Sequence, residues 1–455
     1  MVVSRDPEVS PKSGWNVLSG MPGARSPCRR MCRCGSGARL AGMRIHARMT
    51  TAVALVVTLA VGSGTAASAA SSSGPIPSAA HGAVRFDLPE PTGRQAVGTT
   101  ELHLVDRDRP DPWVADRDRE LMVSIWYPAR STSGYSRQPY MQPGAARFVD
   151  ESGSFGLARP GEVDWAATRT DAASMAPADD RSRRPIVLYS PGLGIPRALG
   201  TSTAVELASR GYVVVTVDHT HETTPVEFPD GRVELQKEPM AGAETVKKAV
   251  DTRVRDTRFV LDQLAVLRAG RNPDAEERRL PRGLGRALDL DRVGMYGHSA
   301  GGVTAAETMR VDRRIDAGID MDGTLQYNST EFLPVALEGL DRPFMLMGKA
   351  SQTHLNKPSW QSFWDRSTSW KRDLSLERGG HFSYTDAQTI VPAVDERLDI
   401  PAQTREQFIG TVDPERSTAA QRAYVTAFFD QHLLGRPRHL LDRPSPTHPE
   451  VRFVR

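Results

Sequence analysis

The sequence is poor in cysteine, and the few cysteines it has are confined to one end. All three of them, Cys28, Cys32 and Cys34, lie in the N-terminal tenth of the 455 residues. Their Cys-x3-Cys-x-Cys spacing has no further cysteine after it to complete a four-ligand metal site of the common spacings. Beyond this region disulfides cannot hold the chain together, so its stability must come from a full-sized apolar core.

Long hydrophobic runs are also missing. A transmembrane helix needs about 20 consecutive apolar residues, whereas the run at Ala52–Val61 has roughly half that length. Mean hydropathy is −0.41 and 25% of the residues are charged. These values exclude a protein with several membrane spans and describe an ordinary soluble globular chain.

Positive and negative charges nearly balance, since the formal net charge is only +3. Residues 1–69 hold nine Lys and Arg against two acids, a net +7, which leaves 3 − 7 = −4 for the remaining 386 residues. The basic character therefore belongs to the N-terminal segment. A polyanion-binding function loses its support, and we expect no nucleic-acid partner.

The N-terminal segment contains the parts of a secretory signal peptide. Within residues 43–69, a basic start precedes the short apolar core and then the small-residue site Ala67-Ser-Ala69. A retained membrane anchor is the less favoured alternative because the apolar core is short. We expect translation to start at Met43, cleavage near Ala69 and a secreted protein, with residues 1–42 as an upstream extension.

After this leader we expect a linker over 70–81, one catalytic domain over 82–437 and a tail over 438–455. Residues 82–130 alternate in the manner of antiparallel strands. Residues 134–184 are rich in Pro, Gly, Ser and charge, and they predict a long surface excursion. No internal repeat is present.

From Pro185 onward, short apolar strands alternate with helices. The expected strands are Pro185–Tyr189, Gly211–Val217, Arg292–Tyr296, Ile315–Met321, Pro343–Met347 and Leu374–Glu377. The expected helices are Ala198–Arg210, 244–268, Ala300–Met309, 358–368 and Ser417–Leu434. This alternation favours parallel βαβ units, and hence the α/β class with helices on both faces of a mostly parallel sheet.

The sharpest motif is Gly297-His-Ser299-Ala-Gly301. An apolar strand leads into it and an Ala-rich helix leaves it, which is the context of a nucleophile elbow. Such a turn admits only small residues beside the serine and places the serine hydroxyl at a helix N-terminus, where a developing anion is favoured. We therefore interpret Ser299 as a nucleophile rather than part of a plain glycine turn.

A serine nucleophile needs a base and an acid that orients the base. His381 follows the last expected strand, in the chain order Ser, acid, His of α/β-hydrolases. The acid is expected at Asp322, at the end of the strand that follows the elbow helix, with Asp320 as the deeper alternative. The next strand ends in Gly348-Lys-Ala-Ser-Gln and offers no carboxylate.

The oxyanion formed on attack requires preorganised N–H donors. The amide of Ala300, directly after the nucleophile, is one. The loop Pro191-Gly-Leu193-Gly is expected to supply the other, and Leu193 is the better donor because Pro191 has no N–H. A simple glycine-rich turn is the alternative reading of that loop.

Other chemistry-bearing residues have weaker interpretations. His298 is expected to pack. Asp218, His219 and His221 follow a strand and resemble part of a metal site, but no further ligand is evident, so no metal and no cofactor are expected. The aromatic residues Trp360, Phe363, Trp364 and Trp370 are equally compatible with an acyl cleft and with the core.

Four segments in order resemble the platelet-activating factor acetylhydrolases and their bacterial relatives. They are Ser124-Ile-Trp-Tyr-Pro-Ala129, Pro191-Gly-Leu-Gly194, Gly297-His-Ser-Ala-Gly-Gly302 and Gly318-Ile-Asp-Met-Asp322. The resemblance implies an α/β-hydrolase fold and a metal-independent Ser/Asp/His triad that removes short or oxidised acyl chains from phospholipids. Carried over by position, it implies Ser299, Asp322 and His381 as the triad, with the amides of Leu193 and Ala300 as the oxyanion hole.

The sequence departs from the family in places. Ser190-Pro191 stands where the family often has His before its Gly-Leu-Gly, and Ala300 stands where the animal enzymes resemble one another in an aromatic residue. Residues 134–184 and 269–290 match nothing in that pattern. These departures concern the acyl pocket, and so the natural substrate, rather than the chemistry.

The sequence thus predicts a secreted serine esterase or lipase acting on lipid-like esters, with transient contact to a membrane or micelle surface. A polyester hydrolase, a general lipase or peptidase, and an acyltransferase on the same fold are the alternatives. A catalytically inactive binding protein is the non-enzyme alternative. The polyester enzymes resemble this chain but place their acid after the later strand, near Lys349.

Overall fold

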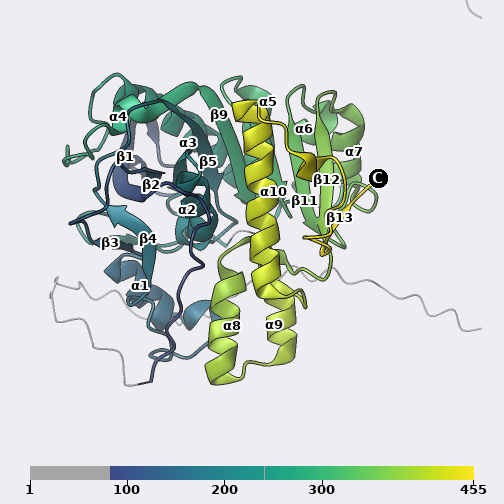
Figure 1. Ribbon diagram of the computed structural model, residues 1–455, viewed down its shortest axis with the longest axis horizontal. Coiled ribbons are helices and arrows are strands. Elements are labelled where there is room, and N and C mark those ends of the chain that lie inside the picture. Colours follow the sequence, from purple (N-terminus) through teal and green to yellow (C-terminus); the bar gives the residue numbers. More distant parts are fainter. Residues whose placement is uncertain (1–81, 240) are drawn as a thin grey trace, which may run out of the picture. The chain divides into compact units, whose positions relative to one another are not determined.

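The computed structural model describes residues 82–239 and 241–455. The leader and linker expected within residues 1–81 lie outside the described residues. An eleven-stranded sheet runs through the described chain in the order β13-β12-β11-β10-β9-β5-β6-β2-β1-β4-β3 (Figure 1). A separate pair, β7 (Val226–Glu227) and β8 (Val233–Glu234), forms a small antiparallel ribbon.

The centre of the large sheet is parallel, as the alternation of strands and helices predicts. Its strands are β5 (Arg184–Ser190), β6 (Val213–Asp218), β9 (Leu288–His298), β10 (Ala317–Met321), β11 (Phe344–Lys349) and β12 (Lys371–Leu376). All neighbouring pairs among these six are parallel. Because parallel strands end at the same edge, the loops after β5, β9, β10 and β12 share one edge of the sheet, where open α/β sheets bind their ligands.

Strands with mostly antiparallel pairing flank this centre. They are β1 (Val97–Pro110), β2 (Asp118–Pro128), β3 (Arg137–Pro139), β4 (Arg169–Ser174) and, at the other edge, β13 (Val451–Phe453). Strand β2 pairs antiparallel with both β1 and β6, whereas β1 and β4 pair in parallel. The α/β class with N-terminal antiparallel strands is confirmed.

Two segments differ from the sequence-based expectation. Residues 134–184 are not a surface excursion: they supply β3, β4, helix α1 (Pro143–Glu151) and the short turn η1 (Ser154–Gly156). Trp165 within them is only 2% exposed and packs edge-to-face on Phe86. The tail after residue 437 likewise forms a short turn, η4 (His439–Leu441), and β13, which closes the sheet against β12.

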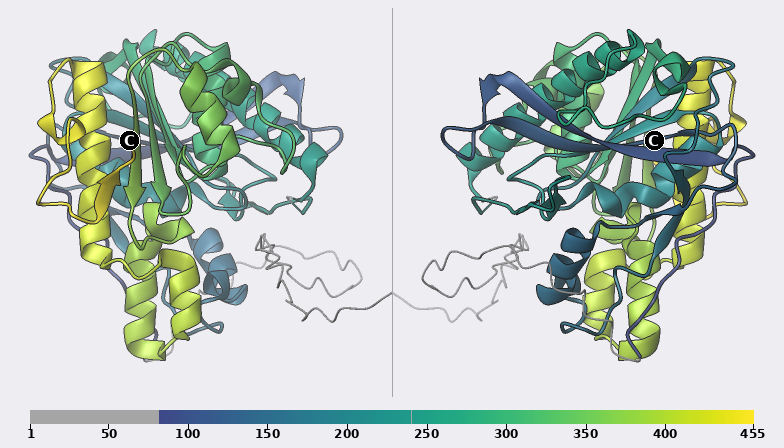
Figure 2. Two further views of the ribbon diagram at one scale, coloured as in Figure 1. Left: turned by 90° about the vertical axis from the view of Figure 1, so that its right-hand side faces the viewer. Right: turned by 90° about the vertical axis from the view of Figure 1, so that its left-hand side faces the viewer.

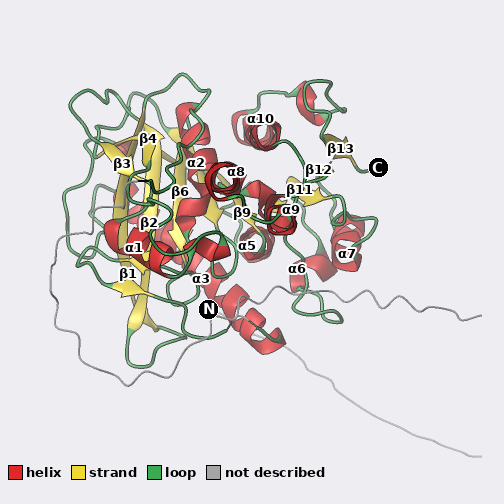
Figure 3. Cartoon of the chain, turned by 90° about the horizontal axis from the view of Figure 1, so that it is seen from below, coloured by secondary structure: helices red, strands yellow, loops and turns green. Residues whose placement is uncertain are grey.

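Helices cover both faces of the sheet (Figure 3). One face carries α2 (Thr201–Ser209), which continues the turn η2 (Arg197–Gly200), and α10 (Pro414–Leu434). The other carries α3 (Ala243–Arg268), α5 (Ala300–Val311), α6 (Pro334–Glu338) and α7 (Pro358–Arg366). The one-turn helix α4 (Leu284–Ala287) leads into β9. A separate apolar cluster fills the space on each face.

The aromatic residues around α7 belong mainly to the core. Trp360 and Phe363 have no exposed surface, and Phe363 packs edge-to-face on Phe344 of β11. Trp364 is partly buried and stacks on His354. Of the two readings that the sequence left open for this cluster, burial therefore holds for Trp360 and Phe363.

A helical hairpin that the sequence did not predict extends from one end of the sheet. It consists of α8 (Ala387–Leu398) and α9 (Ala402–Ile409), which follow the turn η3 (His381–Tyr384) (Figures 1 and 2). Its buried face joins Val84, Phe86 and Trp165 in a third apolar cluster. In the described part of the chain, no helix is both long and apolar enough to cross a membrane.

Candidate active site

Ser299 lies between β9 and α5 in a strained backbone conformation, with φ 54° and ψ −122°. Its neighbours are small because the turn is tight. A Cβ added to Gly297 would lie 2.1 Å from the carbonyl carbon of Gly301, and one added to Gly301 would lie 1.8 Å from the carbonyl oxygen of Ser190. Such distances are far below van der Waals contact, so this turn admits only glycine at both positions, as a nucleophile elbow requires.

The end of β10 places Asp322 beside His381. The Oδ2 atom of Asp322 lies 2.6 Å from Nδ1 of His381, although the two residues are 59 positions apart. Asp322 itself has φ 60°, which turns it out of the strand. Its other oxygen, Oδ1, accepts a 3.0 Å hydrogen bond from the backbone N–H of Lys349. The carboxylate is thus fixed from two sides and aims one oxygen at the imidazole.

His381 and Ser299 are both partly exposed on the edge formed by the carboxyl ends of the strands. The register of β9 and β10 pairs His298 with Met321, so that Ser299 and Asp322 follow paired residues, and Ser299 N–H donates to the Met321 carbonyl at 2.7 Å. The Ser299 hydroxyl makes no hydrogen bond to His381 in the described structure. In enzymes without substrate such bonds are often long and shorten in the reactive complex.

Asp320, the alternative acid, has a different environment. Its Oδ1 accepts a 2.8 Å hydrogen bond from the Gly323 N–H, and its Oδ2 has no partner among the described residues. Complete burial, together with the charge of Asp322, holds the pKa of Asp320 well above its usual range. Asp320 therefore supports the turn after β10, while the carboxylate that contacts His381 is that of Asp322.

The two predicted oxyanion donors, Ala300 and Leu193, lie in the segments that follow the neighbouring strands β9 and β5. Ala300 is the first residue of α5, whose initial N–H groups have no partner within the helix. Leu193 lies in the loop after β5, and its N–H donates to no protein acceptor in the described part of the chain. Both donors are therefore available to a ligand, and the N-terminus of α5 adds a partial positive charge.

His298 does more than pack. Its Nε2 lies 2.8 Å from the carbonyl oxygen of His381, and the two rings lie 4.6 Å apart between centroids. Burial keeps the pKa of His298 well below its usual range, so the ring is neutral and its Nε2–H donates. His298 thereby fixes the backbone of His381. The sequence could not reveal this bond because it joins residues 83 positions apart.

His219 and His221 take part in a buried network of charged groups. His219 contacts Ser190 Oγ and Asp256 Oδ2, each at 2.9 Å, and Nδ1 of His221 lies 3.1 Å from Asp111 Oδ2. Among the described residues, no group of three or more His, Cys, Asp or Glu side chains is arranged to hold a metal ion. Local hydrogen bonding is what the structure shows for these histidines.

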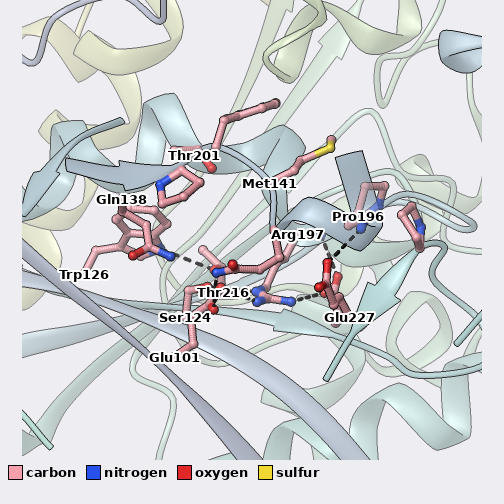
Figure 4. A pocket seen from close by; sticks show the side chains of 17 residues that line it. Glu101, Ser124, Trp126, Gln138, Met141, Pro196, Arg197, Thr201, Thr216 and Glu227 are labelled. Carbon is pink, nitrogen blue, oxygen red and sulfur yellow. Dashed lines mark hydrogen bonds and ion pairs between the residues drawn. The ribbon is translucent and has the colours of Figure 1, made fainter. Parts of the chain in front are cut away.

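A small cavity lies next to the residues that follow the oxyanion loop, residues 191–194; Figure 4 shows its lining. Pro196, Arg197 and Asp218 form part of its wall, and neither Ser299 nor His381 lines it. Three of its charged groups are paired with one another: Arg197 bonds Asp218 through Nη1 and Glu101 through Nη2. The cavity thus has a largely paired, polar wall.

Asp386, the residue directly before α8, should make the stability of this region depend on pH. Burial raises the pKa of Asp386 to about 7, against 3.8 for a free carboxyl, even though Ser202 N–H and the Tyr140 hydroxyl donate to it. The folded state thus binds a proton that the unfolded state has lost, so this group's contribution to stability falls as pH rises from about 4 to about 7.

We therefore expect Asp386→Asn to raise the free energy of unfolding by about 1–4 kcal/mol at pH 8 and to change it little at pH 4. Urea unfolding at a series of pH values measures the effect. Asp399→Asn, at an exposed position beyond the same helix, is the control. If the free energy of unfolding of wild type and of Asp386→Asn varies with pH in the same way, the raised pKa of Asp386 is wrong.

Comparison with known proteins identifies the family of this chain. The family model of the platelet-activating factor acetylhydrolases, isoform II, matches residues 86–327, which include Ser299 and Asp322. The chain belongs to this family. The resemblance found in the four sequence motifs is confirmed.

Relatives within and beyond this acetylhydrolase family are esterases. A probable 1-alkyl-2-acetylglycerophosphocholine esterase of Arthroderma benhamiae is 30% identical over 387 residues, which cover 81% of this chain and 94% of the relative. The platelet-activating factor acetylhydrolase of Cavia porcellus is 22% identical over 52% of this chain and 55% of its own. A solved ferulic acid esterase from Streptomyces cinnamoneus is 38% identical, with a TM-score of 0.67, over 81% of this chain and 99% of that structure. The protein is a carboxylic ester hydrolase with an α/β-hydrolase fold.

Proposed function

We propose that the protein is a serine esterase that cleaves short-chain, lipid-like esters through an acyl-enzyme. The observation that carries this proposal is the 2.6 Å contact between Asp322 and His381, at the edge where the elbow presents Ser299. A buried carboxylate on Nδ1 fixes the imidazole tautomer and leaves Nε2 to act as a base.

The proposed reaction uses the chain's own groups. His381 takes the proton of Ser299 as Oγ attacks the acyl carbon, and the resulting imidazolium is stabilised by Asp322. The N–H groups of Leu193 and Ala300 receive the oxyanion. The imidazolium then protonates the leaving alcohol, and a water molecule activated by the same histidine releases the acid.

Several observations support a lipid-like or aromatic ester as substrate. Phe382 and Phe408 are only partly buried, and their rings stack with centroids 5.2 Å apart. Phe382 also contacts the ring of His381 edge-to-face. They offer an apolar surface next to the base. Family membership and the name of the Arthroderma benhamiae relative favour an acetylated alkyl phospholipid.

The second candidate is a hydroxycinnamate esterase. It is favoured by the ferulic acid esterase structure, which is more similar in sequence to this chain than the phospholipid esterase reported above. A panel of 4-nitrophenyl acetate, an acetylated alkyl glycerophosphocholine and methyl ferulate separates the two. The first candidate predicts a higher kcat/KM on the phospholipid than on methyl ferulate, and the reverse order favours the second.

The same panel addresses the remaining alternatives. Adding an alcohol acceptor and analysing the products identifies an acyltransferase, because the acyl group then appears on the acceptor. A polyester film tests for polyester hydrolysis. Release of free acid from the small esters, with no transfer and no film erosion, is the outcome that the serine esterase proposal predicts.

We also propose that the protein is exported after removal of a signal peptide. The support is the basic start, apolar core and small-residue site within residues 43–69. Expression of the full chain in a secreting host, followed by N-terminal sequencing of protein from the medium, tests it. A mature N-terminus near Ala70 is expected, and retention of the enzyme in the cells with its leader intact contradicts it.

A further inference from the structure

The strongest unexplained feature of the molecule is a buried arginine beneath the oxyanion loop. Arg253 lies on α3, and neither its side chain nor that of Glu222 has more than 1% of its surface exposed. Burying a charge is costly unless it is paired and fully hydrogen-bonded. Arg253 contacts neither Ser299 nor His381 among the described residues, so the reaction as described leaves it without a role.

The hydrogen bonds of Arg253 use every donor that a guanidinium has. Nε and Nη2 bind the two carboxylate oxygens of Glu222, each at 2.5 Å. Nη1 donates to the carbonyl of Pro191 at 2.5 Å and to Ser190 Oγ at 3.2 Å, while Nη2 also donates to the carbonyl of Gly192 at 3.0 Å. Five N–H groups thus meet five acceptors in one planar fork.

The bond to Gly192 bears directly on the oxyanion hole. The carbonyl of Gly192 and the N–H of Leu193 belong to the same peptide unit, which is planar, so in the trans form the two groups point in opposite directions. Holding the carbonyl against α3 therefore aims the N–H away from α3. An added Cβ on Gly192 would lie 3.1 Å from His298 Nδ1, so this loop also borders the elbow.

Ser190 ties the same loop to a second buried group. Its hydroxyl lies 2.9 Å from His219 Nε2, and His219 Nδ1 lies 2.9 Å from Asp256 Oδ2. This Ser–His–Asp series resembles a triad, yet Ser190 is only 1% exposed and has no access to substrate. Its effect is to fix the end of β5, from which the oxyanion loop starts.

We propose that Arg253 and its partner Glu222 are positioning residues that set the direction of the Leu193 N–H toward the oxyanion. This inference rests on the proposed serine esterase mechanism. It explains why a charge pair is buried below a loop of uncharged residues. Because the hole is aligned before substrate arrives, no binding energy is spent on turning the peptide in the transition state.

The test is Arg253→Lys, which keeps the charge but cannot reproduce the fork of five donors. Removing one oxyanion donor from a hydrolase typically lowers kcat by about 10²-fold or more. We expect Arg253→Lys to lower kcat on 4-nitrophenyl acetate about 10²-fold with KM changed less than about twofold. The inhibition constant of an alkyl trifluoromethyl ketone, whose adduct with Ser299 carries an oxyanion, should rise by a similar factor.

Arg422→Lys is the matched control. Arg422 on α10 is also buried and donates to backbone carbonyls, those of Pro89, Glu90 and Ser202, but none of these belongs to the oxyanion loop or to the Ser190 series. It should lose stability in the same way while kcat and the ketone inhibition constant stay within a few-fold. An equal fall in kcat for both variants would show a general loss of packing and overturn the inference.

Two further results separate the outcomes. If Ser299→Ala stays active, the proposed mechanism itself fails, whatever Arg253→Lys does. If Ser299→Ala is inactive and Arg253→Lys keeps wild-type kcat and ketone affinity, only the positioning role fails. Where Arg253→Lys does not fold, Glu222→Gln takes its place: a kcat about 10-fold lower at constant KM supports the role, and an unchanged kcat overturns it.

Discussion

Replacing Ser299 by alanine should lower kcat for 4-nitrophenyl acetate by about 10⁵–10⁶-fold, because loss of the nucleophile leaves only binding and the oxyanion hole to accelerate the reaction. The fold should survive, since the Ser299 hydroxyl makes no hydrogen bond in the described structure and an alanine fits where a serine stood. Steady-state kinetics and thermal unfolding on the same preparation measure both effects.

The result has a clear contrary outcome. If Ser299→Ala hydrolyses the ester at more than about a tenth of the wild-type rate and unfolds at the same temperature, Ser299 is not the nucleophile. His381→Ala serves as the companion variant. Its activity should fall by a comparable factor, because groups that act as a unit lose nearly all of their effect when either is removed.

The second large effect is expected for Asp322→Asn. An asparagine keeps the shape of the side chain but cannot stabilise the imidazolium and favours the wrong tautomer of His381, which costs about 10⁴-fold in kcat in a serine hydrolase of known mechanism. The 2.6 Å contact between Asp322 and Nδ1 of His381 is the basis for expecting a similar loss here. Steady-state kinetics over a range of pH measures it.

Asp320→Asn is the matched control for this variant. Asp320 lies two residues earlier, within β10, and its burial raises its pKa and so favours the neutral form, which an amide resembles. Its kcat should stay within a few-fold of wild type. A large loss for Asp320→Asn together with a small one for Asp322→Asn would reverse the assignment of the two acids.

The parts of the site that follow from local sequence could be predicted. The elbow around Ser299 needs only a strand, a tight turn and a helix, all contiguous in the chain. Asp322 and His381 could be placed because parallel strands bring their carboxyl ends to one edge. The end of β11, which carries no carboxylate, contributes a backbone donor to the acid instead: the Lys349 N–H binds Asp322.

The parts of the fold and site that depend on contacts between residues far apart in the chain could not be predicted from the sequence. Helix α8 contains Pro392, which argues against a helix in sequence-based reasoning, and its stability comes from packing on a distant apolar cluster. Residues 134–184 show no hydrophobic periodicity. Trp165 and its neighbours are buried by contacts with distant parts of the chain, and not along one face of a regular helix or strand. The bonds from Arg253 to the oxyanion loop span more than 60 residues and leave no local pattern.

The most direct test of the central claim is to label the wild-type enzyme with a fluorophosphonate and map the adduct by mass spectrometry. The reagent phosphonylates an activated serine and no ordinary one. We predict one adduct per chain, on Ser299, with loss of esterase activity in proportion to labelling. An adduct on another residue, or full activity in a chain labelled at Ser299, would contradict the account.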